Sequence, residues 1–273
     1  MRNSNICGNI NTNNKSLHGT YTMVDLRIRS RVLLACLSLI VLGGCSSTPS
    51  GESGDPHESM NRTFYAFNDT LDKTFLEPIA KKYTDIAPDP VRDGVTNFFD
   101  NVGSLNTITN DLLQGKMRRF FGDSSRFIVN STVGIGGLFD PATSLGLEQH
   151  EEDLGQTVGT WGANEGAYLM LPFLGPSSYR DIGSPVMGIL LNPLTYLAPV
   201  VTVPLGAVNA INSRANLLDA TRIRDQAALD PYTFVREAWR QQREFQIYDG
   251  NPPGDGFEEY IDGEGEAAIL RVY

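Results

Sequence analysis

The sequence has no cysteine after residue 45, because Cys7, Cys36 and Cys45 are its only three. The rest of the chain therefore forms no internal disulfide, although this absence neither shows nor excludes an oxidising compartment. Positive charge is also scarce, with 22 Lys and Arg against 32 Asp and Glu and a formal net charge of -10 at pH 7. Such a negative balance disfavours nucleic acid as a partner.

The groups that catalysis and metal binding need are few. After Cys45 only His57 and His150 remain, and neither belongs to a triad-like or ligand-spaced pattern. HExxH, CxxC-pair, GxSxG and Walker-lysine motifs are all missing. The acidic residues around His150 lack regular ligand spacing, so we interpret them as a solvated loop. We therefore expect no catalytic residue, no metal site and no cofactor.

Charge of either sign is missing from Ile182 to Ser213, a stretch of 32 residues. About 20 apolar residues form a helix that crosses a bilayer core, but prolines interrupt this stretch and each removes a backbone donor. A lipid-exposed span must satisfy every backbone group internally. Broken apolar helices suit either a protein core or a protein sunk part-way into a membrane. The four prolines are Pro185, Pro193, Pro199 and Pro204.

The N-terminus has the pattern of a secretory signal. Arg27, Arg29 and Arg31 precede an eleven-residue apolar run, residues 32–42, which Gly43 and Gly44 separate from Cys45. Eleven apolar residues are too few to span a bilayer. Because residues 1–22 are polar and rich in asparagine, we expect Met23 to be the true start and residues 1–44 to be a signal peptide.

A cysteine directly after Leu-Gly-Gly resembles a bacterial lipoprotein signal. In that class Cys45 is acylated and becomes the first mature residue, and two or more acyl chains anchor a protein firmly. Ser46 follows Cys45, whereas Asp at that position marks inner-membrane retention in the best-known cases, so the outer membrane is favoured. Residues 45–54 then form a lipidated cysteine and a flexible Ser- and Gly-rich tether.

The body of the chain has a helical pattern. Asp favours the N-cap and Pro the first helical position, so each of four Asp-Pro pairs predicts a helix start. Apolar residues recur at spacings of three and four over residues 60–71, 91–99, 120–128, 205–218 and 235–239. Only Ala167 to Leu171 has an extended pattern, because Pro172 restricts the residues before it. We predict a mainly α fold with little or no β structure, as one domain over residues 55–248, followed by an acidic disordered tail over residues 249–273.

Several blocks of the body match a known family in their order. The most specific are residues 155–162, Gly-Gln-Thr-Val-Gly-Thr-Trp-Gly, and residues 168–181, Tyr-Leu-Met-Leu-Pro-Phe-Leu-Gly-Pro-Ser-Ser-Tyr-Arg-Asp. Asp55-Pro56, Asn61-Arg62, Phe67-Asn68, residues 134–140 and residues 230–232 agree in the same order. Together these blocks resemble the MlaA (VacJ) family of outer-membrane lipoproteins over roughly residues 55–250. Ala167 departs from the Pro that many members have there.

The resemblance implies a ring-like, all-helical body that lies in one leaflet of the outer membrane, anchored at Cys45 on the periplasmic side. It implies a passive channel through which phospholipid leaves the outer leaflet, so that lipid asymmetry is maintained. The expected partners are phospholipid, outer-membrane porin trimers, a soluble periplasmic phospholipid carrier and, indirectly, an inner-membrane ABC transporter. The resemblance implies no enzymatic activity.

Two groups of residues are candidates for the lipid path. Asn61, Arg62 and Arg180 could contact headgroups, and Arg180 is favoured because a guanidinium grips phosphate bidentately; a structural Arg180–Asp181 ion pair is the alternative. The segment from Gly166 to Pro176 could be a gate, because glycine permits the backbone change of a hinge. A rigid hairpin that only shapes the pore is the alternative. The gate candidates are Gly166, Tyr168, Leu169, Leu171, Phe173, Leu174 and Gly175.

Three other functions stay open on the sequence. A structural envelope lipoprotein could scaffold porins without moving lipid. A lipid hydrolase or acyltransferase would need a nucleophile–base pair, for which two histidines leave little room. A soluble periplasmic lipid binder conflicts with the lipidation predicted at Cys45.

Overall fold

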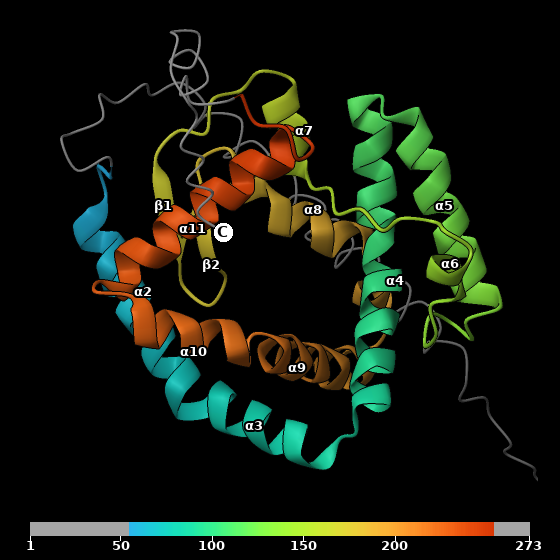
Figure 1. Ribbon diagram of the computed structural model, residues 1–273, viewed down its shortest axis with the longest axis horizontal. Helices are drawn as coiled ribbons and strands as arrows, with labels where there is room; N and C mark the ends of the chain where they lie inside the picture. Colours follow the sequence, from blue (N-terminus) through green and yellow to red (C-terminus); the bar gives the residue numbers. More distant parts are fainter. Residues whose placement is uncertain (1–54, 254–273) are drawn as a thin grey trace, which may run out of the picture. The chain divides into compact units, whose positions relative to one another are not determined.

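The computed structural model describes residues 55–253. The predicted signal peptide, Cys45, its tether and residues 254–273 of the predicted tail lie outside the described residues. Within them the regular elements are helices, apart from one antiparallel pair of short strands (Figure 1). The predicted mainly α fold class is confirmed.

The helices and strands follow one another in a simple order. The first half contains α2 (Glu58–Leu71), the π-helical turn η1 (Asp72–Leu76), α3 (Glu77–Ile86), α4 (Asp89–Gln114), α5 (Met117–Thr132), α6 (Pro141–Ser144) and α7 (Leu154–Thr160). The second half contains β1 (Tyr168–Leu171), β2 (Gly175–Ser178), η2 (Asp181–Gly183), α8 (Ser184–Leu191), η3 (Pro193–Tyr196), α9 (Pro199–Asn216), α10 (Leu218–Ala227) and α11 (Pro231–Ile247).

All four Asp-Pro pairs lie at helix starts, but only two act as predicted. Asp140 accepts from the Thr143 amide at the start of α6, and Asp230 accepts from the Tyr232 amide at the start of α11. Asp89 already lies inside the first turn of α4, and Asp55 precedes the N-cap of α2. The side chain of Asp55 instead joins a buried cluster with Asn61 and Tyr232.

Helix α9 starts earlier than the sequence pattern indicates. The apolar pattern covers residues 205–218, whereas the helix begins at Pro199 and contains Pro204. Pro199 occupies the first helical position, where its missing donor is not needed. Pro204 removes a single backbone hydrogen bond one turn later, and the helix continues.

Contacts between the elements form a closed circuit. Helix α2 contacts η1 and β1, η1 contacts α3, α3 contacts α9, and α9 contacts α4. Helix α4 contacts α8, α8 contacts η2, and η2 contacts β2, which pairs with β1 and so returns to α2. Figure 1 shows α3 beside α9, and α5 beside α4 outside this circuit.

The interior of this body is largely polar. Its small apolar cluster consists of Tyr168, Met170 and Tyr232, against which Phe64 and Trp239 pack. Other buried positions carry amides, carboxylates and guanidinium groups, including Asn110, Asp111, Asn212, Arg214 and Arg243. Buried polar groups are stable only when they are paired. Hydrogen-bond networks between distant segments, rather than an apolar core, therefore hold much of this fold together.

Candidate functional site

The uncharged stretch lies on the surface. Within residues 182–213 only Asn212 is buried, while Val200 is 80% exposed, Tyr196 71% and Val203 69%. The core alternative for this stretch is therefore wrong, because none of its apolar side chains is buried and most of the large ones on α8, η3 and the first turns of α9 are exposed. None of the helices in residues 55–253 combines the length and apolarity needed to cross a bilayer.

A second apolar surface follows α5. Phe121 and Ile128 on this helix are 65% and 60% exposed, and the turns that follow expose Val133, Ile135 and Phe139. Large exposed apolar patches mark interaction sites with proteins, ligands or membranes. The described body thus has apolar surfaces around a polar interior, opposite to the usual arrangement of a water-soluble domain.

The predicted gate segment is a β-hairpin. Tyr168 pairs with Ser178 and Leu171 with Gly175, and Gly166 and Gly175 both have the positive φ, +74° and +82°, that glycine adopts readily. Tyr168 and Leu169 are buried, and Leu171 is half-buried. Phe173 and Leu174 at the tip are 74% and 64% exposed. The candidates therefore divide into an anchored strand and an exposed apolar tip.

Two asparagines of α2 fasten this hairpin. Asn61 donates to the Tyr168 carbonyl at 3.0 Å and accepts from the Met170 amide at 2.9 Å. Asn68 donates to the Leu171 carbonyl and accepts from the Phe173 amide, both at 2.9 Å. Asn61 is fully buried, whereas Asn68 is half-buried near the tip. The Asn68 bonds that hold the hairpin tip are therefore more accessible to water than the Asn61 bonds that hold β1.

The three headgroup candidates all make internal bonds and do not form one cluster. Asn61 holds the hairpin, and Arg62 pairs with Glu58 and with Asp230 at 2.6 Å. The hydrogen bonds from Arg62 hold the pKa of Asp230 well below its usual range. Arg180 pairs with Asp181 at 3.2 Å with its side chain only 7% exposed, as the structural alternative for Arg180 predicts.

The most connected ion pair was not predicted from the sequence. Arg243 on α11 bonds Asp153, the N-cap of α7, at 2.6 Å and Asp181 of η2 at 2.7 Å. Burial alone would raise the pKa of Asp181, but hydrogen bonds from Arg243 and Arg180 outweigh it and leave that pKa lowered. A side chain at Gly155 would collide with Asp181 and Arg243. The family block 155–162 and helix α11 thus meet at one buried charge cluster.

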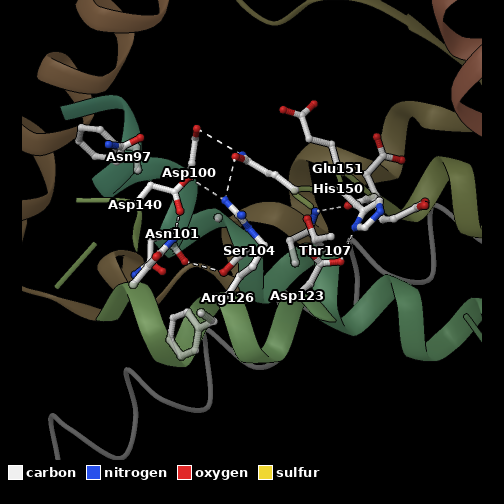
Figure 2. Close-up of a pocket in the computed structure, with 18 of the residues that line it drawn as sticks. Asn97, Asp100, Asn101, Ser104, Thr107, Asp123, Arg126, Asp140, His150 and Glu151 are labelled. Carbon is white, nitrogen blue, oxygen red and sulfur yellow. Dashed lines mark hydrogen bonds and ion pairs between the residues drawn. The ribbon is translucent and has the colours of Figure 1, made fainter. Parts of the chain in front are cut away.

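A polar cavity of about 310 Å³ lies between α4, α5 and the loop before α7. Figure 2 shows Asp100, Asn101, Asp123, Arg126 and His150 around it. The sequence predicts a solvated acidic loop at Glu148, Glu151, Glu152 and Asp153, and this is wrong for Glu152 and for Asp153, which caps α7 and pairs with Arg243. Glu152 is 4% exposed and pairs with Lys116 at 2.8 Å and Arg119 at 3.1 Å. The same two cations also bind Asp249, the first residue of the predicted tail.

These features define a class: a helical protein with apolar outer surfaces, a polar interior and an exposed apolar hairpin tip. The sequence model described as MlaA lipoprotein matches residues 53–246, and the chain belongs to that family. An intermembrane phospholipid transport system lipoprotein MlaA of Shigella flexneri is 34% identical over 80% of this chain and 89% of its own. The one of Escherichia coli K12 is 33% identical over the same shares.

Comparison with solved structures agrees with this assignment. One chain, from work on the structural basis for maintenance of bacterial outer membrane lipid asymmetry, matches with a TM-score of 0.63 and 34% identity. The match covers 71% of this chain and 98% of that chain. An uncharacterised protein of Rickettsia bellii is 36% identical over 71% of this chain and 76% of its own.

Proposed function

We propose that this chain is the outer-membrane lipoprotein of a phospholipid transport system. Acylated at Cys45 and held on the periplasmic side, it removes phospholipids from the outer leaflet through a passive channel and so maintains lipid asymmetry. It passes them to a soluble periplasmic carrier and thereby, indirectly, to an inner-membrane ABC transporter. It works beside outer-membrane porin trimers. The names of its relatives and the order of its motif blocks support this assignment.

The observation that carries the proposal is the exposed apolar surface of α8, η3 and α9. Each large apolar side chain that leaves water contributes about 1.5–3 kcal/mol, so a surface with Val200, Val203 and Ile189 exposed favours a lipid environment. Helix α8 has eight residues, about 12 Å of helix. This length fits within one leaflet of a hydrocarbon core about 30 Å thick.

Phospholipid movement breaks no bond, so the proposal needs no catalytic residue. It needs a route that accepts both a polar headgroup and apolar chains. The polar interior and the exposed tip of the hairpin, Phe173 and Leu174, supply the two kinds of surface. We assign the gate to this tip and its Asn68 bonds, with the strand held by Asn61 as its fixed support.

The test uses Escherichia coli that lacks its own MlaA relative. Wild-type protein should restore low levels of surface phospholipid, measured with an amine reagent that does not cross the membrane. Cys45→Ser, expressed at the same level, should be released from membranes and fail to do so. Released protein that still restores asymmetry would support a soluble carrier. Altered porin organisation with unchanged surface phospholipid would support the scaffold function and contradict the channel.

A further inference from the structure

The wall of the polar cavity carries more negative than positive charge. Six carboxylates line it, whereas Arg126 is its only Lys or Arg within the described residues. Three of these carboxylates have cationic partners: Asp140 binds Arg126 at 3.0 Å, Glu152 binds Lys116, and Asp153 binds Arg243. Charge pairing therefore leaves the other three, Asp100, Asp123 and Glu151, to set the potential inside the cavity.

Those three carboxylates face the cavity from three segments. Asp100 on α4 accepts only a 3.4 Å hydrogen bond from Gln149 among the described residues. Asp123 on α5 bonds the His150 ring at 3.0 Å, and Glu151 in the loop has no ion pair within residues 55–253. Figure 2 shows all three around the same space. A headgroup with net negative charge would be repelled here, and an ammonium attracted.

A neighbouring carboxyl, Asp111, has a raised pKa because of burial and nearby negative charge. Asp111 on α4 is fully buried, and neither of its carboxylate oxygens has a partner. Burial, and then the charges of Asp123 and Glu152, raise its pKa to about 7. This carboxyl therefore keeps its proton to higher pH than a free one, mainly because it is buried and then because negative charge lies nearby.

The cavity suits an organic cation better than a metal ion. No group of three or more His, Cys, Asp or Glu in residues 55–253 is close enough together to hold a metal. Phe99 and Phe127 are among the residues that line the same cavity, and aromatic side chains attract ammonium groups. Carboxamides of Asn97, Asn101 and Gln156 supply hydrogen-bonding groups around it.

An apolar surface borders the cavity. Asn97 of the wall donates to the Leu138 carbonyl, and Leu138 and Phe139 directly precede Asp140 of the wall. Leu138 is 44% and Phe139 61% exposed. A ligand with its head in the cavity could therefore lay an apolar tail along residues 133–139. This combination points to an amphiphile rather than to a small free amine.

We propose that this cavity binds the primary ammonium of a zwitterionic phospholipid headgroup, the ethanolamine class, with its acyl chains against residues 133–139. The inference rests on the proposed transport function and adds a headgroup preference to it. Asp100, Asp123 and Glu151 receive the ammonium, and anionic headgroups with a terminal polyol are disfavoured. A volume of about 310 Å³ is at the small end of ligand pockets and suits a headgroup without its chains.

The test measures binding to the purified full-length lipoprotein in non-ionic detergent by titration calorimetry. The probes are dihexanoyl phosphatidylethanolamine, dihexanoyl phosphatidylglycerol and glycerophosphoethanolamine, which has the ammonium headgroup without acyl chains. We expect the ethanolamine lipid to bind at least about tenfold more tightly than the glycerol lipid, which corresponds to about 1.4 kcal/mol. Glycerophosphoethanolamine should bind more weakly than the ethanolamine lipid, because it lacks the acyl chains.

Variants locate the site. Asp100→Asn and Glu151→Gln should each weaken ethanolamine-lipid binding about two- to fivefold, as expected for partly exposed charges. The double variant should lose most of the headgroup preference. The matched control is Asp93→Asn with Glu148→Gln, because these exposed acids of α4 and of the same loop do not line the cavity. The control should bind like wild type.

The outcomes separate this inference from the proposed function. Equal binding of both headgroups, or an unchanged preference in the double variant, overturns the ammonium site even if wild-type protein restores lipid asymmetry in cells. Glycerophosphoethanolamine that binds as tightly as the lipid overturns the role of residues 133–139. Selective binding by a protein that fails to restore asymmetry supports the site and contradicts the transport function.

Discussion

Asn61 on α2 and Met170 on β1 lie 109 residues apart in the chain, yet the Met170 amide donates to the Asn61 carboxamide oxygen at 2.9 Å. The nitrogen of the same carboxamide returns a hydrogen bond to the Tyr168 carbonyl. One side chain thus makes the two bonds that a neighbouring strand would make. The hairpin is therefore positioned by a helix, and its tip by a second asparagine seven residues further along that helix.

Loss of the Asn68 carboxamide should loosen the hairpin tip without unfolding the protein. Asn68→Ala removes two hydrogen bonds, each contributing about 1 kcal/mol, at a half-buried position. We expect faster hydrogen exchange of the Phe173 amide and a change in surface phospholipid, with a melting temperature lowered by only a few degrees. Thr70→Ala on the exposed face of α2 is the control. Unaltered exchange at Phe173 would show that Asn68 does not hold the tip.

Asn61→Ala should destabilise the buried part of the hairpin, because it leaves two backbone groups there without partners.

A proline substitution at Gly175 would not test whether the hairpin tip is a gate. Its φ of about -65° is incompatible with the +82° found there, so the variant would distort the hairpin rather than lock it.

Replacement of Arg243 should destabilise the whole body. Arg243→Met leaves the Asp153 and Asp181 carboxylates without their shared cation, and breaking a buried pair in this way costs about 3–5 kcal/mol. Chemical denaturation in detergent measures the loss. Arg240→Met is a matched control, because Arg240 is 39% exposed and lies 3.6 Å from Glu165. A loss of stability as small as that of the control would mean that the cluster does not stabilise the fold.

The raised pKa of Asp111 predicts that stability falls as pH rises. Between its ordinary value of 3.8 and about 7, the folded protein keeps a proton that the unfolded chain releases. The free energy of unfolding should therefore decrease by up to about 1.4 kcal/mol per pH unit in this range. Asp111→Asn should remove this contribution and be more stable than wild type at pH 8. Melting curves at pH 5 and pH 8 measure this pH dependence of stability, with Asp93→Asn as the control. Equal pH dependence in Asp111→Asn and Asp93→Asn contradicts the prediction.

The near absence of cysteine permits a direct test of the apolar surface. If residues 1–44 are removed and Cys45 is acylated, Val200→Cys introduces the only free thiol. In outer membranes this thiol should react slowly with a membrane-impermeant maleimide, because lipid covers it. Gln241→Cys on α11 should react fast, since Gln241 is exposed and lies among charged residues. Equally fast reaction at both positions would place α9 in water.

The sequence predicted the elements whose signals are local. The helices now seen as α2, α4, α5 and α11 have regular apolar stripes, and Pro172 marked the extended segment. Helix α10 was not predicted, because it is polar around most of its surface, with Asp219, Arg222 and Arg224 among its residues. Such a helix forms mainly through its tertiary neighbours, which here are α3, α9 and α11.

The candidate site was less accessible to sequence reasoning. The sequence pattern indicates Arg180, but Arg243, which binds the same Asp181 carboxylate, lies 62 residues away from Asp181. No local spacing indicates such an ion pair. The cavity likewise collects residues from α4, α5, α7 and α11. Glu152 looked like part of a solvated run because its partners, Lys116 and Arg119, are distant in sequence.

The carboxamide of Asn61 has one more consequence, for association between copies of the protein. An open strand edge invites addition of a strand from another molecule. In β1 the Tyr168 carbonyl and the Met170 amide, the groups that such an intruder would need, are already occupied by a fully buried side chain. The β1 edge therefore offers no open template for strand addition beside the apolar tip.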